Sequence, residues 1–194
     1  MLSKVSGCLA GKLAKSNIIR EEDFEVYQFG IESFIMKACH LISYVTIGLL
    51  FRRLPELLVF LLAFIPLREC SGGYHARTPL KCYILSCGTV ITFLCLLLFI
   101  PADKTQYSMI LAVISSLILF FIVPVETENK PLSDAEVTYY KSKAGFIIII
   151  ELGLVLIFRM VLWNELSFIL ALSLTYELII ALAGLSAKMA VSRS

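Results

Sequence analysis

Six long apolar runs, separated by short polar segments, constrain the fold of this chain more than any other feature. They cover residues 33–51, 54–67, 80–100, 107–125, 144–162 and 166–185. Hydrophobic residues make up 59% of the 194 residues and charged residues 16%, which is more apolar side chain than a domain of this length can enclose. This composition excludes a soluble enzyme, a disordered chain and a secreted disulfide scaffold, and it predicts an integral membrane protein.

All but one of the runs are long enough for a membrane-spanning helix. A bilayer core about 30 Å thick needs about 20 helical residues. The run 54–67 has 14 residues, which gives a helix of about 21 Å at the helical rise. The helix formed by this run must therefore extend into flanking residues, cause local thinning of the bilayer, or pack inside the bundle. We expect an all-α integral membrane protein with six transmembrane helices. In the longest polar segment, residues 126–143, Ser133-x-x-Glu136 is the pattern of a capping box and predicts a short helix after Pro131.

The segment before the first run has the pattern of an amphipathic helix lying on the membrane surface. Four apolar residues share one helical face, and lysines lie on another: Leu2, Val5, Leu9 and Leu13 against Lys4, Lys12 and Lys15. A helix that packs on the bundle would show the same pattern. The predicted organisation is an interfacial segment over 1–30, a six-helix membrane domain over 31–185 and a short cytoplasmic tail over 186–194.

The distribution of positive charge predicts the orientation in the membrane. If all six runs cross and the N-terminus is cytoplasmic, twelve of the 17 lysines and arginines lie in inner segments and four in outer loops. The positive-inside rule then places both termini and the loop after the second run in the cytoplasm, where disulfides are not expected. The net charge is only +2 and no basic face is present, so nucleic acid is excluded as a partner.

The loop after the second run contains residues suited to nucleophilic catalysis. Thr78 followed by Pro79 is a helix start, with Thr78 as the N-cap, so Cys82 falls in the first turn of the next helix. The unpaired N–H groups of that turn, together with Arg77 and Lys81, favour the thiolate, which is the nucleophilic form. Cys82 is therefore a candidate nucleophile.

His75 is the candidate base for Cys82. Residues seven apart on one continuous helix are separated by about 10.5 Å along the axis, so the chain must turn between the two. Pro79 provides that break because it disfavours helical geometry at the preceding residue. Gly72 and Gly73 allow positive backbone dihedrals, and their N–H groups could bind an oxyanion, although a Gly-Gly pair often serves only as a turn.

Two other interpretations of the ionisable residues remain open. Cys70, His75 and Cys82 could bind a metal, although a fourth ligand and a C-x-x-C pair are missing. A small transporter could use the ionisable residues at membrane depth, which are Lys37, His40, Glu151 and Glu177. The chain lacks the inverted repeat and the broken helix pairs typical of transporters.

The loop also resembles a known family. Arg68, Gly72-Gly73, His75-Ala76 and Cys82 match the pattern R-x3-G-G-x-H-A-x5-C of the accessory gene regulator B (AgrB) family of membrane cysteine endopeptidases, which process quorum-sensing peptide precursors. Residues 29–32, and Pro124 with residues 129–132, are similar to other parts of that family. The resemblance covers nearly the whole chain.

The resemblance implies an activity and a partner. Cys82 would be the nucleophile and His75 its base, with Arg68, Gly72 and Gly73 supporting the site. The substrate would be an AgrD-like precursor whose acidic C-terminal tail suits Arg77 and Lys81. Cleavage through a thioester would be followed by cyclisation to a thiolactone or lactone. We expect no cofactor and no metal, the lipid bilayer as a second partner, and an assembly that is either a monomer or a homodimer.

Overall fold

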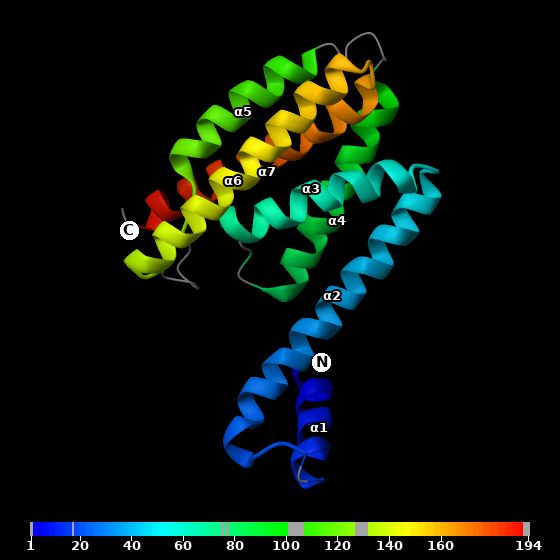
Figure 1. The fold of residues 1–194 in the computed structure, drawn as a ribbon. Helices are drawn as coiled ribbons and strands as arrows, with labels where there is room; N and C mark the ends of the chain where they lie inside the picture. Colours follow the sequence, from blue (N-terminus) through cyan, green and yellow to red (C-terminus); the bar gives the residue numbers. More distant parts are fainter. Residues whose placement is uncertain are drawn as a thin grey trace. The chain divides into compact units, whose positions relative to one another are not determined.

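The computed structural model describes residues 2–16, 18–74, 76, 78–100, 107–126 and 132–191, and these residues are mainly α-helical. The helices are α1 (Leu2–Lys15), the short 3-10 helix η1 (Glu21–Asp23), α2 (Phe24–Leu50), α3 (Leu54–Ser71), α4 (Pro79–Phe99), α5 (Ser108–Ile122), α6 (Asp134–Met160) and α7 (Asn164–Val191) (Figure 1). The chain divides into two compact units, residues 1–47 and 48–194, which are described separately.

Among the residues that the structure describes, three helices are long and apolar enough to cross a membrane: Glu21–Leu50, Pro79–Phe99 and Asn164–Ala190. α5 is apolar but shorter. Only 17% of the most apolar stretch of α4 is buried within the structure, so most of its apolar side chains face outward and require lipid. The predicted all-helical membrane fold is confirmed at this level, whereas membrane crossing by α3, α5 and α6 stays a prediction.

In the first unit, α1 lies against α2 through small and polar residues. Gln28 of α2 donates a hydrogen bond to the Ser3 carbonyl over 3.3 Å. Ser6 and Ala10 of α1 are fully buried, while Val5 and Leu9 are exposed. The predicted apolar face of this segment is therefore left uncovered within the structure, and its role at the membrane surface stays a prediction.

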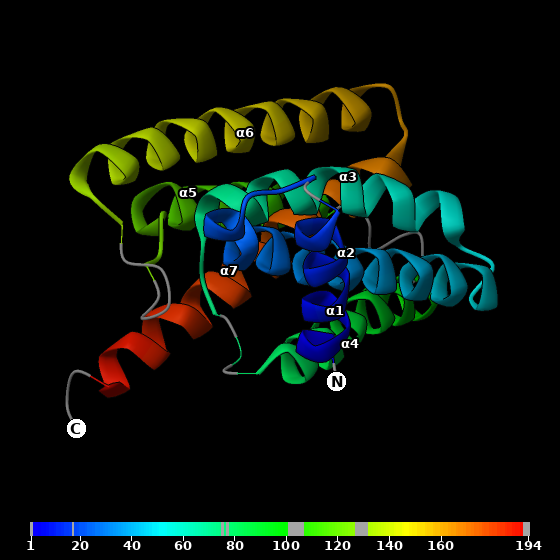
Figure 2. The same ribbon diagram turned by 90° about the horizontal axis from the view of Figure 1, so that it is seen from below.

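The second unit is built around α7. Helices α3, α5 and α6 all pack against α7, and Figure 2 shows α5 and α6 side by side. α4 joins the bundle through aromatic contacts, because the ring of Phe93 stacks on Phe60 of α3 with centroids 4.0 Å apart. Tyr176 of α7 also donates to the Thr92 hydroxyl of α4 over 3.0 Å. The core therefore lies between α7 and its neighbours, with α4 at one side.

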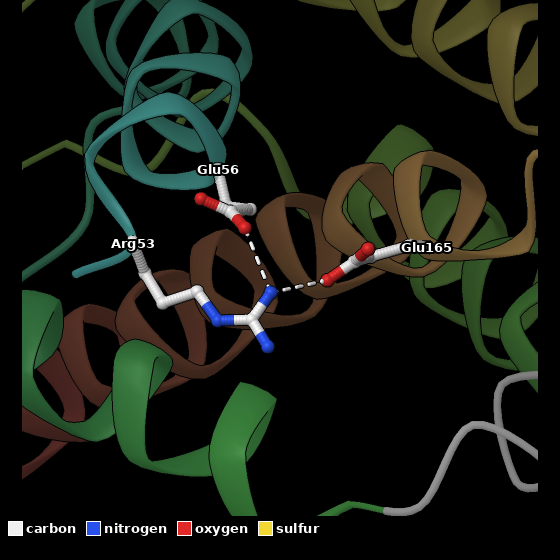
Figure 3. A network of polar contacts seen from close by, with 3 residues as sticks. All are labelled: Arg53, Glu56 and Glu165. Atoms are coloured by element: carbon white, nitrogen blue, oxygen red, sulfur yellow. Dashed lines mark hydrogen bonds and ion pairs between the residues drawn. The ribbon is translucent and has the colours of Figure 1, made fainter. Parts of the chain in front are cut away.

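One end of this unit brings the starts of three helices together. Arg53, which precedes α3, contacts Glu56 at 2.7 Å and Glu165, at the start of α7, at 2.9 Å (Figure 3). At the start of α5, the hydroxyl of Ser108 lies 3.0 Å from that of Ser167. α3, α5 and α7 therefore begin at the same end and run in the same direction.

The intervening helices run in the opposite direction. Ser167 at the start of α7 donates over 3.1 Å to the carbonyl of Val155, near the end of α6. At the other end of α7, Lys188 contacts Glu126, the second residue after Pro124, at 3.0 Å. Chain direction thus alternates from α5 through α6 to α7, as it must in a bundle whose consecutive helices are joined by short connections.

The predicted helix starts agree with the structure, but one predicted length was wrong. Thr78 is the N-cap of α4, with Pro79 at its first position. Ser133 and Glu136 form the predicted capping box. That box opens the 27-residue α6 rather than a short helix, because residues 134–143 contain no Gly or Pro to end the helix before the apolar run. α3, which contains Pro66, likewise continues past the run 54–67 as far as Ser71, where Gly72 follows as its C-cap.

Candidate functional site

Gly72, Gly73 and Tyr74, which we call the glycine loop, follow directly after α3. Gly72 has φ of 70° and Gly73 has φ of 101°. Residues with a side chain rarely adopt these values, whereas glycine does so at little cost. The two glycines therefore end α3 and turn the chain away from the helix axis, which explains why α3 and α4 are separate helices.

The glycine loop pairs with the segment after α5. The N–H of Val125 donates to the Ser71 carbonyl over 2.7 Å, and the N–H of Gly73 donates to the Val125 carbonyl over 3.2 Å. A Cβ on Gly72 would lie 2.2 Å from the Val125 carbonyl oxygen. The Gly73 N–H is therefore paired in this structure, and binding of an oxyanion by the two glycines stays a prediction.

The glycine loop also lies directly on α7. The N–H of Tyr74 donates to the carbonyl of Ile180 over 3.1 Å. A Cβ on Gly184 would lie 2.7 Å from backbone atoms of Gly73 and Tyr74. Sequence reasoning did not identify Val125, Ile180 or Gly184. The only indication was a glycine inside an apolar run, a residue type enriched where helices of membrane proteins are approached closely.

Arg68 connects the glycine loop to a buried carboxylate. Its Nη2 donates to the carbonyl of Tyr74 over 2.7 Å. Its Nη1 lies 3.6 Å from Oε1 of Glu177 on α7, and the two side chains are 19% and 0% exposed. Arg68 thus joins three parts of the structure: the end of α3, the glycine loop and α7.

Cys82 lies in the first turn of α4, as predicted. Its N–H donates to the carbonyl of Thr78 over 3.1 Å, and the N–H of Lys81 donates to the Thr78 hydroxyl over 3.3 Å. The Cys82 side chain is half-buried and Lys81 is exposed. His75 and Arg77 lie outside the described residues, so their pairing with Cys82 and with substrate stays a prediction.

The remaining cysteines differ from Cys82 in their surroundings. Cys70 is 3% exposed and belongs to the hydrophobic core together with Leu67. Its burial raises the pKa of the Cys70 thiol, which opposes formation of a thiolate. Cys8 and Cys39 are exposed, and Cys87 and Cys95 are half-buried within α4. Cys82 thus combines partial exposure with a position at a helix start.

The residues of the transporter interpretation lie in different surroundings. In the second unit, Glu177 contacts Arg68, and Glu151 of α6 is 3% exposed. In the first unit, Lys37 is exposed, and the ring Nδ1 of His40 donates to the carbonyl of Met36 in the same helix over 2.8 Å. The described contact of Glu177 is therefore to Arg68 of α3, which also donates to the glycine loop.

Comparison with known proteins relates this arrangement to one family. The family model described as accessory gene regulator B matches residues 6–183. An AgrB-like protein of Clostridium perfringens SM101 is 27% identical over 193 residues, which cover 94% of this chain and 88% of that protein. Accessory gene regulator protein B of Staphylococcus intermedius is 24% identical over 144 residues, which cover 73% and 75% of the two chains. No solved structure matches the chain.

Proposed function

Because the chain belongs to the accessory gene regulator B family, whose members act with a peptide precursor in the accessory gene regulator quorum-sensing system, we propose that it is a membrane cysteine endopeptidase. Its substrate is an AgrD-like precursor, and it removes the C-terminal tail of that precursor. The observation that supports this most is the half-buried thiol of Cys82 in the capped first turn of α4, a few residues after the glycine loop.

The proposed reaction needs one nucleophile and one base. His75 takes the proton of the Cys82 thiol, and Sγ attacks the carbonyl carbon at the junction of peptide and tail. The amide bond breaks, the tail leaves as an amine with the proton from His75, and a thioester remains on Cys82. A thiol or hydroxyl within the peptide then attacks the thioester, which closes a thiolactone or lactone ring and frees Cys82.

The charges near Cys82 suit the acidic tail of such a precursor. Lys81 is exposed in the first turn of α4, and the N-terminal end of a helix favours negative charge. Arg68, by contrast, already contacts Glu177 and Tyr74. We therefore assign tail attraction to Lys81 and Arg77, and we assign to Arg68 a role within the protein.

A covalent intermediate provides the test of the proposed function. Membranes containing the protein are mixed with precursor, quenched in acid and analysed by intact-mass and peptide mass spectrometry. We expect an added mass equal to the precursor without its tail, located on Cys82 and released by hydroxylamine, which cleaves thioesters. The His75→Ala protein serves as the control and is expected to form no adduct. Tail removal with an adduct on another cysteine would contradict the assignment.

The alternating helix directions of the second unit support a multi-pass topology, and the distribution of lysines and arginines favours the cytoplasmic side for the glycine loop and Cys82. The proposed inner end is the one with the Lys188–Glu126 pair, and the outer end is the one with Arg53 and Glu165. We retain the division into a segment over 1–30, a membrane domain over 31–185 and a tail over 186–194 as part of this proposal.

Thiol labelling checks this topology. A membrane-impermeant maleimide is expected to modify Cys82 in permeabilised cells but not in intact cells, with the modified peptide identified by mass spectrometry. The matched control is Trp163→Cys, in the connection between α6 and α7, where Trp163 is exposed. This cysteine is expected to react in intact cells. Modification of Cys82 in intact cells would mean that the topology is inverted.

A further inference from the structure

We propose that Glu177 of α7 is a positioning residue for the reaction, acting through Arg68 on the backbone directly before His75. This inference rests on the proposed function, since it concerns the histidine and the cysteine assigned there. Glu177 itself touches neither substrate nor the reacting atoms. Its effect is to hold the guanidinium group of Arg68, and Arg68 in turn holds the glycine loop.

Burial of Glu177 is the first observation. Its side chain is 0% exposed, and the only ion pair that it makes among the described residues is with Arg68, at 3.6 Å. Within that part of the chain neither carboxylate oxygen has a hydrogen-bond partner. A carboxylate in such surroundings is costly unless a positive group neutralises it. Arg68 supplies that group, so the guanidinium is held close to α7.

The planar shape of the Arg68 guanidinium makes the position of the glycine loop depend on the contact with Glu177. Nη1 faces Glu177, while Nη2 donates to the Tyr74 carbonyl over 2.7 Å. Because the guanidinium is planar and rigid, a partner that holds one nitrogen also determines where the other nitrogen lies. The group also packs directly on the loop backbone, since a Cβ on Gly73 would lie 2.9 Å from Nη1. Glu177 therefore determines how Arg68 meets the glycine loop.

Covalent connectivity relates this contact to the reaction. Tyr74 immediately precedes His75 in the sequence, and consecutive Cα atoms are about 3.8 Å apart. A fixed Tyr74 carbonyl thus limits where the next residue can be placed relative to Cys82. Since proton transfer requires hydrogen-bond distance between base and nucleophile, a small displacement of this backbone lowers the rate strongly.

A purely structural role of Glu177 makes different predictions, which a second buried carboxylate allows us to test. Glu151 of α6 is 3% exposed and lies near Ser173 and Glu177, so its substitution changes the charge around Glu177 without removing the contact of Glu177 with Arg68. Within the described part of the chain, no contact between Glu151 and Arg68 is present. The backbone bonds of the loop to Val125 and Ile180 do not involve Glu177, so the defect expected of a Glu177 variant is in geometry and not in folding.

The experiment compares Glu177→Gln with Glu151→Gln in the full-length protein in membranes. We expect Glu177→Gln to lower precursor cleavage by about tenfold to a hundredfold, while Glu151→Gln stays within about threefold. The amount of inserted protein is measured for each variant. The Arg68→Gln and Glu177→Gln changes are also combined, and we expect the double variant to be no worse than Arg68→Gln alone, because both act through one contact.

Alkylation of Cys82 gives a readout that does not require the precursor. The rate of reaction with iodoacetamide is followed against pH by mass spectrometry. We expect Glu177→Gln to move this profile toward that of His75→Ala, and Glu151→Gln to leave it unchanged. Three results would overturn the inference. The first is an equal loss of cleavage in Glu177→Gln and Glu151→Gln, and the second is a double variant in which the losses caused by Arg68→Gln and Glu177→Gln multiply. The third is a pH profile of Cys82 alkylation that Glu177→Gln leaves unchanged.

A second variant covers the case in which Glu177→Gln does not insert. Arg68→Lys keeps the positive charge beside Glu177 but cannot offer two nitrogens in a fixed plane. We expect normal insertion with cleavage lowered about tenfold or more, and full activity of Arg68→Lys would overturn the inference. The proposed function fails separately, namely if Cys82→Ala still removes the tail.

Discussion

Replacement of Cys82 by alanine is expected to lower precursor cleavage by at least about a thousandfold, as loss of a nucleophile does in other covalent proteases. The physical reason is that alanine offers no group that can form the thioester. The N-cap of α4 depends on Thr78 and not on Cys82, so the variant should insert normally. Cleavage of a tagged precursor by membranes of the variant, at matched protein amount, is the measurement.

The other cysteines serve as matched controls for this change. Cys87 and Cys95 lie on the same helix as Cys82, and Cys70 lies in the core at the end of α3. Cys87→Ala and Cys95→Ala are expected to keep cleavage within about threefold, and Cys70→Ala to keep most of it, since alanine leaves only a small cavity. His75→Ala is expected to be as inactive as Cys82→Ala. If Cys70→Ala were equally inactive and zinc co-purified with the protein, the metal interpretation would replace the peptidase.

Replacement of Gly184 by alanine is expected to lower cleavage by about a hundredfold, although this residue belongs to no motif. The new Cβ would lie 2.7 Å from backbone atoms of the glycine loop, whereas an ordinary contact is at least 3.4 Å. Backbone atoms on both sides cannot rotate away as a long side chain can, so the loop must move off α7. That movement disturbs the Tyr74–Ile180 hydrogen bond and the residue before His75.

Two other helical glycines provide the control for Gly184. Gly88 of α4 and Gly153 of α6 have open space where a Cβ would be added. Gly88→Ala and Gly153→Ala are therefore expected to keep insertion and cleavage within about twofold, because alanine also favours helix. A Gly184→Ala protein with the activity of these controls would show that close packing of the glycine loop on α7 is not required. Cleavage and inserted amount are measured together for all three variants.

The elements of this protein follow from local patterns that are visible in the sequence. Each of the six apolar runs overlaps a single helix, and the starts at Thr78 and Ser133 are as predicted. These agreements have a common reason, since a helix is held by bonds between residues four apart and its ends by side chains three residues away. The short helix predicted before the run 144–162 was wrong for a local reason too, because polar residues by themselves do not end a helix, and α6 continues into the apolar run.

The contacts that hold the glycine loop depend on residues far apart in the sequence. Arg68 and Glu177 are more than a hundred positions apart, and Gly73 meets both Val125 and Ala181. By its position in an apolar run, Glu177 belongs with Glu151, Lys37 and His40 to the ionisable residues predicted at membrane depth. Neither charge nor spacing indicated that its partner is the arginine of the loop motif. That pairing depends on α3 and α7 running in the same direction, which no local pattern encodes.

The sequence by itself thus determined that this is a helical membrane protein, and it indicated which loop we propose as the site of the chemistry and where in a helix the thiol of Cys82 lies. Tertiary structure alone decided that α7 supports the loop, through the carboxylate of Glu177, the carbonyl of Ile180 and the missing side chain of Gly184. The physical reason is the range of the interactions involved. Hydropathy and capping act within a few residues, whereas close packing joins whatever segments the fold brings together.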